Sequence, residues 1–579
     1  MTRGMRKGLT SYGDADFSLF LRKAFIKAMG LSDDALTRPI VGIANTFSDY
    51  NACHGNVPKL VEAIKRGVML AGGLPMEFPT ISIHESFAYP TSMFLRNLMA
   101  MDTEEMLRAQ PMDSVVLIGG CDKTIPAQMM AAASADVPTV IVPVGPMLVG
   151  HHHGEQLGAC TDCRRLWSDF RGGRIDAAEI EAVNSRLAPT PGTCMVMGTA
   201  STMACIVETM GLGVPLSATI PATHADRLRS AEASGRCAVA MAEQGSPRPT
   251  ELMTRAAFRN ALVVLQAIGG STNGLIHLTA AAGRCGIRLE LDEVDRIGRE
   301  VPVLIDLKPS GAHYMEHFHW AGGVPRLLVE LAEHLDLSLP TVTGKPLQSL
   351  VDGAERVRGQ DVIRSRADPV NASGSMAVLR GNLAPRGAII KQSAASPRLM
   401  QHTGRARVFD SVDEMSRRID DPDFDVGPDD VLVMRNAGPI GAPGMPEAGS
   451  FPIPRKLAAQ GVKDMVRISD ARMSGTAFGT IVLHMTPEAA AGGPLGLVRD
   501  GDTIALDVAG RRIDLQVDDA ELARRRAAGT RSAGAAPTPD RGYAALFHRC
   551  VLQADEGCDF DFLVPGRAAR TADDPDAPG

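Results

Sequence analysis

The chain has 579 residues, too many for one hydrophobic core, so we expect two or three domains. A hydrophobic content of 45%, a charged content of 22% and a net charge of −7 are typical of a globular protein. This charge argues against a protein that binds nucleic acid by neutralising phosphates. The sequence shows neither a run of about 18 apolar residues nor a secretory signal, so we expect no membrane span and a cytoplasmic location.

The first 150 residues alternate between strand-like and helix-like patterns. Apolar runs predict strands at 39–44, 78–83, 115–118 and 139–144. Amphipathic spacing predicts helices at 17–30, 57–71 and 90–108, and another helix is expected to begin near Pro126. The alternation predicts an α/β fold whose N-terminal domain is a parallel sheet with helices on both faces.

Chemically active side chains follow three of these strands. Cys53 follows the first strand, Glu85 the second, and Cys121-Asp122-Lys123 the third. Because the carboxyl ends of parallel strands meet at one edge of a sheet, we expect these residues to gather there. A thiolate beside a carboxylate can contact a soft and a hard metal together. Taken alone, the tripeptide would indicate an inert buried cysteine, and the other motifs favour a site instead.

A third cysteine lies in a comparable position. Residues 151–193 are expected to be an excursion with a helix near 177–187, and Cys194 follows it near the start of a small-residue helix. The dipole of that helix favours a thiolate. Thiolates at Cys53, Cys121 and Cys194 could hold an iron–sulfur cluster and leave one iron short of a protein ligand.

The excursion itself contains a second group of possible ligands. Cys160 and Cys163 have C-x-x-C spacing and lie beside residues 151–153, which are all histidine. A zinc site is one interpretation, but no second C-x-x-C follows. We therefore favour ordinary polar loop residues.

The pattern changes after a mostly helical stretch at 225–350. Short strands are predicted at 376–380, 388–391, 406–409, 431–434, 465–468 and 480–484, and a strand pair begins after 500–502. We assign residues 1–370 to the α/β domain and 371–565 to a β-rich, barrel-like C-terminal domain. Residues 529–540 are expected to be a linker, and 566–579 a disordered tail.

Two stretches of the second domain carry candidate site residues. Glu447 is the only charge of a Gly/Pro loop, and with Glu85 and Asp122 it would suit Mg²⁺. Ser474 follows a strand in Ser-Asp-Ala-Arg-Met-Ser-Gly-Thr and could be a nucleophile or base. Considered separately, each stretch is more typical of an ordinary turn.

Together these motifs resemble the family of dihydroxy-acid, 6-phosphogluconate and sugar-acid dehydratases. The matching segments are 120–124, 192–194, 197–203, 269–273, 381–385, 444–447 and 469–475. The resemblance implies a cluster on Cys53, Cys121 and Cys194. It also implies Mg²⁺ held by Glu85, Asp122, Glu447 and a carbamylated Lys123, with Ser474 as the catalytic base. Thr476 is a candidate substrate-binding residue.

Within the family, the chain looks like the sugar-acid branch. Glu85-Ser86-Phe87 followed by 90–93 stands where the dihydroxy-acid branch has Ser-Asp-Gly, and 542–544 and 559–563 also match. That branch dehydrates acids such as arabinonate or xylonate and typically carries [2Fe–2S], whereas other branches carry [4Fe–4S]. The chain departs from the family pattern at His54, Asn56, His84 and Ala437, where we expect effects on the substrate pocket.

The resulting hypothesis is an iron–sulfur and Mg²⁺-dependent hydro-lyase that converts a sugar acid to its 2-keto-3-deoxy acid. The resemblance also implies a homodimer or homotetramer with a small-molecule substrate. From the net charge and the lack of a long apolar run, we expect no nucleic-acid or membrane partner. One alternative is the dihydroxy-acid dehydratase of branched-chain amino-acid synthesis. A remote alternative is a non-catalytic iron–sulfur redox sensor.

Overall fold

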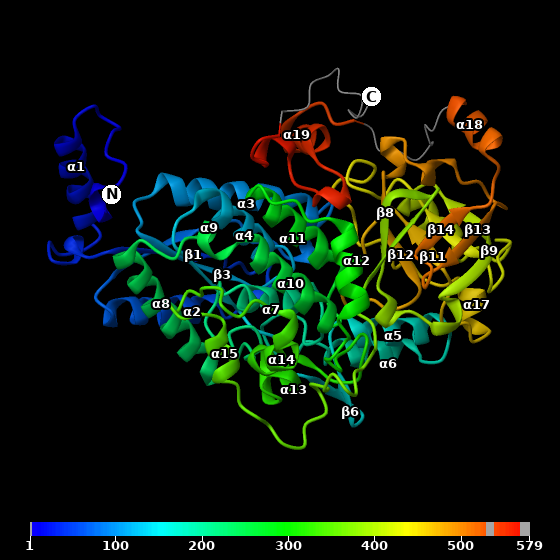
Figure 1. The fold of residues 1–579 in the computed structure, drawn as a ribbon, viewed down its shortest axis with the longest axis horizontal. Coiled ribbons are helices and arrows are strands. Elements are labelled where there is room, and N and C mark those ends of the chain that lie inside the picture. Colours follow the sequence, from blue (N-terminus) through cyan, green and yellow to red (C-terminus); the bar gives the residue numbers. More distant parts are fainter. Residues whose placement is uncertain (1–2, 529–537, 568–579) are drawn as a thin grey trace.

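The computed structural model describes residues 3–528 and 538–567 and contains a parallel α/β sheet and a closed β-barrel (Figure 1). The sheet and its helices form the left and centre of the view, and the barrel forms the right. Both parts of the predicted fold class are confirmed. Within these described residues, no helix is long and apolar enough to cross a bilayer.

Four parallel strands form the N-terminal sheet in the order β2-β1-β3-β4. They are β1 (Ile40–Asn45), β2 (Leu74–Pro79), β3 (Ser114–Gly119) and β4 (Thr139–Pro143). The middle strand β3 is buried throughout, which explains why it appears in the sequence as a continuous apolar run.

The second strand was predicted in the wrong place. We expected it at 78–83, but β2 begins at Leu74 and ends at Pro79. It is an edge strand that pairs with β1 alone, and edge strands tolerate the two prolines that made its sequence look unlike a strand. Glu85 therefore follows β2 after a short extended segment rather than directly.

Helices cover both faces of the sheet. One face carries α2 (Val57–Leu70) and α8 (Ala225–Gln244), and the other carries α3 (Ser92–Ala109) and α4 (Thr124–Ala135). The first pair crosses very closely, because a Cβ at Gly67 would lie 2.0 Å from the Glu232 carbonyl oxygen. Glycine is required there by packing rather than by backbone conformation.

The remaining helices surround this core. N-terminal α1 (Ala15–Lys27) projects from the body in Figure 1. The others are α7 (Thr199–Thr209), α9 (Pro249–Leu252), α10 (Arg255–Ala267), α11 (Thr272–Arg284), α12 (Leu291–Glu300), α13 (Met315–Trp320), α14 (Gly323–Leu331) and α15 (Gln348–Asp352).

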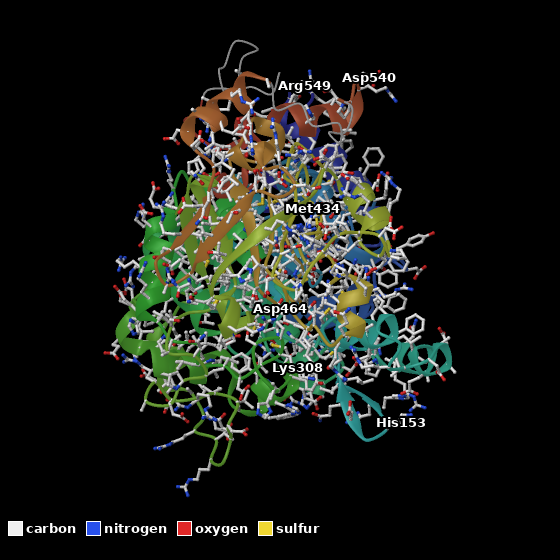
Figure 2. All side chains as sticks on the ribbon, turned by 90° about the vertical axis from the view of Figure 1, so that its right-hand side faces the viewer. His153, Lys308, Met434, Asp464, Asp540 and Arg549 are labelled. Carbon is white, nitrogen blue, oxygen red and sulfur yellow. The ribbon has the colours of Figure 1, made fainter. Side chains whose placement is uncertain are left out.

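The excursion contains an element that sequence reasoning missed. A two-stranded hairpin, β5 (Gly150–His152) and β6 (Glu155–Leu157), precedes α5 (Thr161–Arg171) and α6 (Ala177–Asn184). Strands of three residues carry too little alternation to be recognised. Figure 2 shows the hairpin at the edge of the molecule, with His153 at its tip and Lys308 further inside.

Eight strands close the barrel in the order β10-β11-β12-β8-β7-β14-β13-β9. They are β7 (Ala377–Gly381), β8 (Ala384–Ile390), β9 (Gln401–Phe409), β10 (Val431–Met434), β11 (Arg467–Ser469), β12 (Ile481–Thr486), β13 (Thr503–Asp507) and β14 (Arg512–Leu515). Helices α16 (Val412–Arg418), α17 (Arg455–Ala459) and α18 (Asp519–Ala527) lie outside it. Strands β10 and β11 are parallel neighbours, so the loops that follow them leave the same end of the barrel.

The C-terminal segment returns to the α/β domain. Helix α19 (Gly542–Cys550) packs near α3, where the Tyr543 hydroxyl donates to the Phe94 carbonyl at 2.7 Å. Arg284 and Asp559 form an ion pair whose side chains are fully buried. Most of the predicted linker and nearly all of the predicted tail lie outside the described residues.

Candidate active site

The Cys121 loop is positioned by a buried histidine. Strand β3 ends at Gly119, and α4 begins at Thr124. Between them, the backbone N–H groups of Gly120 and Cys121 both donate to His54 Nε2 at 3.1 Å. His54 Nδ1 lies 2.8 Å from the Thr46 carbonyl oxygen, so a neutral ring donates there and accepts at Nε2. Burial lowers the pKa of His54 to about 4, which keeps the ring neutral.

The structure gives His54 a positioning role that the sequence did not reveal. We predicted that the departures at His54 and Asn56 affect the substrate pocket. The structure buries both side chains, and the Asn56 amide donates to the carbonyls of Val144 and Ala222 at 3.0 and 3.1 Å. Ala437 is likewise fully buried. The contacts of His54 and Asn56 thus hold loops of the site in place, and an effect of these departures on the substrate pocket stays a prediction.

Two of the predicted thiols lie side by side. Cys53 follows β1 and Cys121 follows β3, and their Sγ atoms lie within 4.8 Å of each other and of a His84 ring nitrogen. A hydrogen bond with Cys121 and burial raise the pKa of Cys53, and the Cys194 thiol is close enough to add to the rise. Cys194 is not a member of this 4.8 Å group among the described residues.

The three predicted carboxylates also come together. Oxygen atoms of Glu85, Asp122 and Glu447 lie within 4.8 Å of one another, although Glu447 comes from the barrel and the others from the sheet. The side chains remain 26%, 19% and 15% exposed, so solutes can reach the group. Burial and the charge of Glu85 raise the pKa of Glu447, as expected for carboxylates that share one space.

Lys123 is buried and contacts two of these carboxylates. Its Nζ lies 2.8 Å from Glu85 and 3.5 Å from Asp122, and its side chain is 1% exposed. Burial and Arg472 act to lower the pKa of Lys123, but the surrounding carboxylates outweigh them and the net shift is upward.

Arg472 was not assigned a role from the sequence, although it lies in the Ser474 motif. Its fully buried guanidinium donates to Glu447, to Glu85 at 3.2 Å and to the Thr91 hydroxyl at 2.9 Å. It therefore joins the barrel to the sheet. No local signal distinguishes it, because its partner Glu85 lies 387 residues away in the sequence.

Ser474 lies on the loop that follows β11, two residues after Arg472. The Ser474 and Thr476 hydroxyl oxygens lie 2.9 Å apart. A Cβ at the intervening Gly475 would lie 2.7 Å from the Ser271 side chain, so this loop packs tightly against the start of α11. Asn273, in the first turn of α11, donates to Glu447 at 3.3 Å. The serine loop and the carboxylates thus share one scaffold.

Lys391 is a second residue that sequence reasoning missed. It follows β8, is fully buried, and its Nζ lies 3.4 Å from the Gly475 carbonyl oxygen. Burial lowers its pKa to about 7. Because burying a charged amine is costly, a buried lysine in contact with the serine loop is a candidate for a functional role.

The donor chemistry fits two kinds of inorganic group. Clustered thiols suit iron–sulfur chemistry, and three converging carboxylates suit a hard divalent cation. The three carboxylates together carry more negative charge than the positive charge of Lys123 and Arg472 can balance. The set therefore has room for additional positive charge. Asp122 adjoins Cys121 in the chain, so the two donor sets are neighbours.

The C-x-x-C and histidine groups of the excursion do not form one ligand set among the described residues. Two of the three histidines contact Glu179: His152 Nε2 lies 2.8 Å and His153 Nε2 3.5 Å from its carboxylate. Cys160 turns the other way, and its Sγ lies 3.3 Å from Cys194 Sγ. Sequence reasoning treated Cys160 as an ordinary loop residue and missed this contact.

Comparison with known proteins gives consistent matches over nearly the whole chain. Residues 38–350 match the family model "Dihydroxy-acid/6-phosphogluconate dehydratase N-terminal", and residues 361–558 match its C-terminal counterpart. The chain is 47% identical to L-arabonate dehydratase of Azospirillum brasilense, with 96% of this chain and 97% of that protein aligned. It is 45% identical to 6-deoxy-6-sulfo-D-gluconate dehydratase of Pseudomonas putida (95% of each chain). It is 38% identical to dihydroxy-acid dehydratase of Moorella thermoacetica (92% of this chain, 97% of that protein).

Proposed function

The chain belongs to the dihydroxy-acid/6-phosphogluconate dehydratase family, and we propose that within it the chain dehydrates a sugar acid, an aldonate such as arabinonate or xylonate. The expected product is the 2-keto-3-deoxy acid. The family and the relatives are dehydratases, which confirms the prediction of a hydro-lyase. The observation that carries the proposal is the meeting of thiols, carboxylates and the Ser474 loop at the junction of sheet and barrel.

The polar surroundings of the carboxylates support a polyhydroxylated substrate. The segment that looks like the sugar-acid branch encloses Glu85, whose carboxylate accepts from the hydroxyls of Thr91 and Ser92. Buried hydroxyl and amide groups of Thr199, Ser271 and Asn273 form a polar network that reaches Glu447 through Asn273. A sugar acid offers several hydroxyls to such groups, whereas a branched-chain acid needs an apolar pocket.

The proposed cofactors follow from the donor sets. Cys53, Cys121 and Cys194 would hold a [2Fe–2S] cluster, with [4Fe–4S] as the alternative. Glu85, Asp122, Glu447 and a carbamylated Lys123 would hold Mg²⁺. When bound, these groups supply Lewis acidity toward the substrate carboxylate and hydroxyls and stabilise nearby negative charge. Carbamylation would replace the Lys123 ammonium by an oxygen donor.

The side chains of the barrel would handle the proton. Ser474 would take the proton from C2, and the 3-hydroxyl would leave with a second proton as water. The resulting enol becomes the keto acid when C3 gains a proton. Thr476, 2.9 Å from Ser474, would orient the serine hydroxyl and contact the substrate. The surrounding cations would stabilise a serine alkoxide that is costly on its own.

The second candidate is a dihydroxy-acid dehydratase of branched-chain amino-acid synthesis. Identity of 36–38% to several dihydroxy-acid dehydratases favours it, although the sugar-acid relatives are more similar. A homodimer or homotetramer in the cytoplasm remains our prediction for either function.

The test is 2-keto acid formation by anaerobically reconstituted protein with Mg²⁺. The panel contains pentonates and hexonates of defined stereochemistry and 2,3-dihydroxyisovalerate. Turnover confined to sugar acids is expected, whereas preference for dihydroxyisovalerate would replace the proposal by the second candidate. Ser474→Ala should abolish turnover with iron content retained. Ser234→Ala, a buried serine on α8, is the matched control and should stay active.

A further inference from the structure

Three cysteine thiols form a chain at the edge of the proposed cluster site. Cys160 Sγ lies 3.3 Å from Cys194 Sγ, and the Cys163 thiol, three residues further along the chain, is close enough to affect the pKa of Cys160. All three residues are partly exposed, so small oxidants can reach them. Cys160 can therefore bond with Cys194 after a small movement of its sulfur, and the C-x-x-C spacing also allows a bond with Cys163.

The backbone holds Cys160 in an unusual conformation. Its φ is 76° and its ψ −38°, in a region that non-glycine residues rarely adopt. It is the residue before α5, and Cys163 lies in the first turn of that helix. A C-x-x-C pair at a helix start places two thiols near each other, so one can attack a disulfide formed by the other. Strain at such a residue points to a functional role.

Neighbouring contacts keep this conformation in place. The Asp162 carboxylate accepts from Lys308 Nζ at 3.0 Å, from the Tyr314 hydroxyl at 2.9 Å and from the Gly158 N–H at 2.8 Å. The Thr161 hydroxyl donates to the Thr476 carbonyl at 3.1 Å, so the C-x-x-C segment also contacts the serine loop. The thiols are thus presented by a fixed segment rather than by a free loop.

We propose that Cys160 and Cys163 are a redox-active dithiol that removes oxidative damage from Cys194 and so preserves a ligand for cluster assembly. The inference rests on the proposed function, because it takes Cys194 as a cluster ligand. The co-reactants are a peroxide as oxidant and an external dithiol as reductant.

The chemistry takes place in two steps. In the cluster-free protein, a peroxide accepts two electrons from the thiols of Cys160 and Cys194. A disulfide forms between them, and hydrogen peroxide leaves as two molecules of water. The Cys163 thiolate, having lost its proton to solvent, then attacks the Cys160 sulfur. The Cys160–Cys163 bond forms, the Cys160–Cys194 bond breaks, and Cys194 leaves as a thiolate. An external dithiol finally reduces the Cys160–Cys163 disulfide.

The test uses the full-length, cluster-free protein. It is treated with equimolar hydrogen peroxide, quenched in acid and alkylated, and its disulfides are mapped by mass spectrometry. The wild type should contain the Cys160–Cys163 disulfide with Cys194 alkylated. Cys163→Ser should trap Cys160–Cys194 instead. In Cys160→Ser neither disulfide should form, and Cys194 should accumulate sulfinic acid. Cys237→Ser, a partly exposed cysteine on α8, is the matched control and should behave as the wild type.

Iron and sulfide content after reconstitution gives a second readout. After peroxide, Cys163→Ser should bind at least threefold less iron and sulfide than the wild type, and dithiothreitol should restore it. If Cys163→Ser forms no Cys160–Cys194 disulfide, the inference is overturned and the proposed function stands. The disulfide maps could be as expected while Cys194→Ser binds as much cluster as the wild type. In that case Cys194 is not a cluster ligand, so the proposed function is wrong on this point and the protective role falls with it.

Discussion

Arg472→Met is the substitution that tests most directly how the site joins the two domains. It removes a guanidinium that contacts two carboxylates, Glu85 and Glu447, and the Met445 carbonyl oxygen at 2.7 Å, and it keeps most of the side-chain volume. Breaking a buried ion pair from one side costs about 3–5 kcal/mol, because a charge is left unpaired. In a cooperative unit of about 200 residues, each kcal/mol of lost stability lowers the Tm by about 2–4 °C. The expected fall in Tm is therefore on the order of 10 °C.

The assay is thermal unfolding of the metal-free protein with and without Mg²⁺. The variant has lost one cation beside three carboxylates, so Mg²⁺ should restore more of its Tm than it adds to the wild type. Arg467→Met is the matched control, because it breaks a buried pair with Asp464 at 3.1 Å in the barrel. It should lower the Tm without a larger Mg²⁺ response. A Tm for Arg472→Met within about 2 °C of the wild type, or the same Mg²⁺ response in both variants, would refute the reasoning.

Three further changes have definite expected outcomes. His54→Ala leaves the Gly120 and Cys121 N–H groups without their acceptor, and each unpaired group costs about 1–3 kcal/mol. The Cys121 loop should then be held less firmly, so the iron bound per chain after reconstitution should fall. Unchanged iron content would contradict the role of His54. Glu208 lies fully buried in α7 and accepts from the Leu216 and Ala218 N–H groups. Burial raises its pKa to about 7, so the folded state holds this proton more tightly than the unfolded state. The stabilisation from this proton is fully present below pH 4.5, the ordinary pKa of a glutamate, and on the order of 3 kcal/mol of it is lost as the pH rises to 7. In Glu208→Gln, the Tm should therefore fall less between pH 4.5 and pH 7 than in the wild type. An identical profile of Tm against pH would count against this assignment. The lowered pKa of Lys391, about 7, acts in the other direction. The unfolded state binds more protons between pH 7 and 10.5, so stability rises over that range, and Lys391→Met should remove part of the rise in Tm; a rise of full size would show that Lys391 is not its source.

Much of the fold follows from local sequence patterns. The β-branched apolar runs of β1 and β3 identify buried parallel strands, because strands covered on both faces carry no polar alternation. Strand β10 was predicted at 431–434 and lies at Val431–Met434. Local patterns failed at β2, whose prolines hide an edge strand, and at the β5–β6 hairpin, whose strands have three residues each.

The sequence by itself determined the alternation of strands and helices, the change to a β-rich second half, and the motifs that identify the family. These depend on residues that are close in the chain, where periodicity and spacing are visible. Only the tertiary structure decided which distant groups meet. Arg472 contacts Glu85 across 387 positions, Lys391 reaches the Gly475 carbonyl across 84, and Cys160 reaches Cys194 from a segment whose sequence suggested an ordinary loop. The first contact arises when the barrel and the sheet pack together, and the other two arise when distant segments of one domain fold against each other. No local pattern encodes that packing.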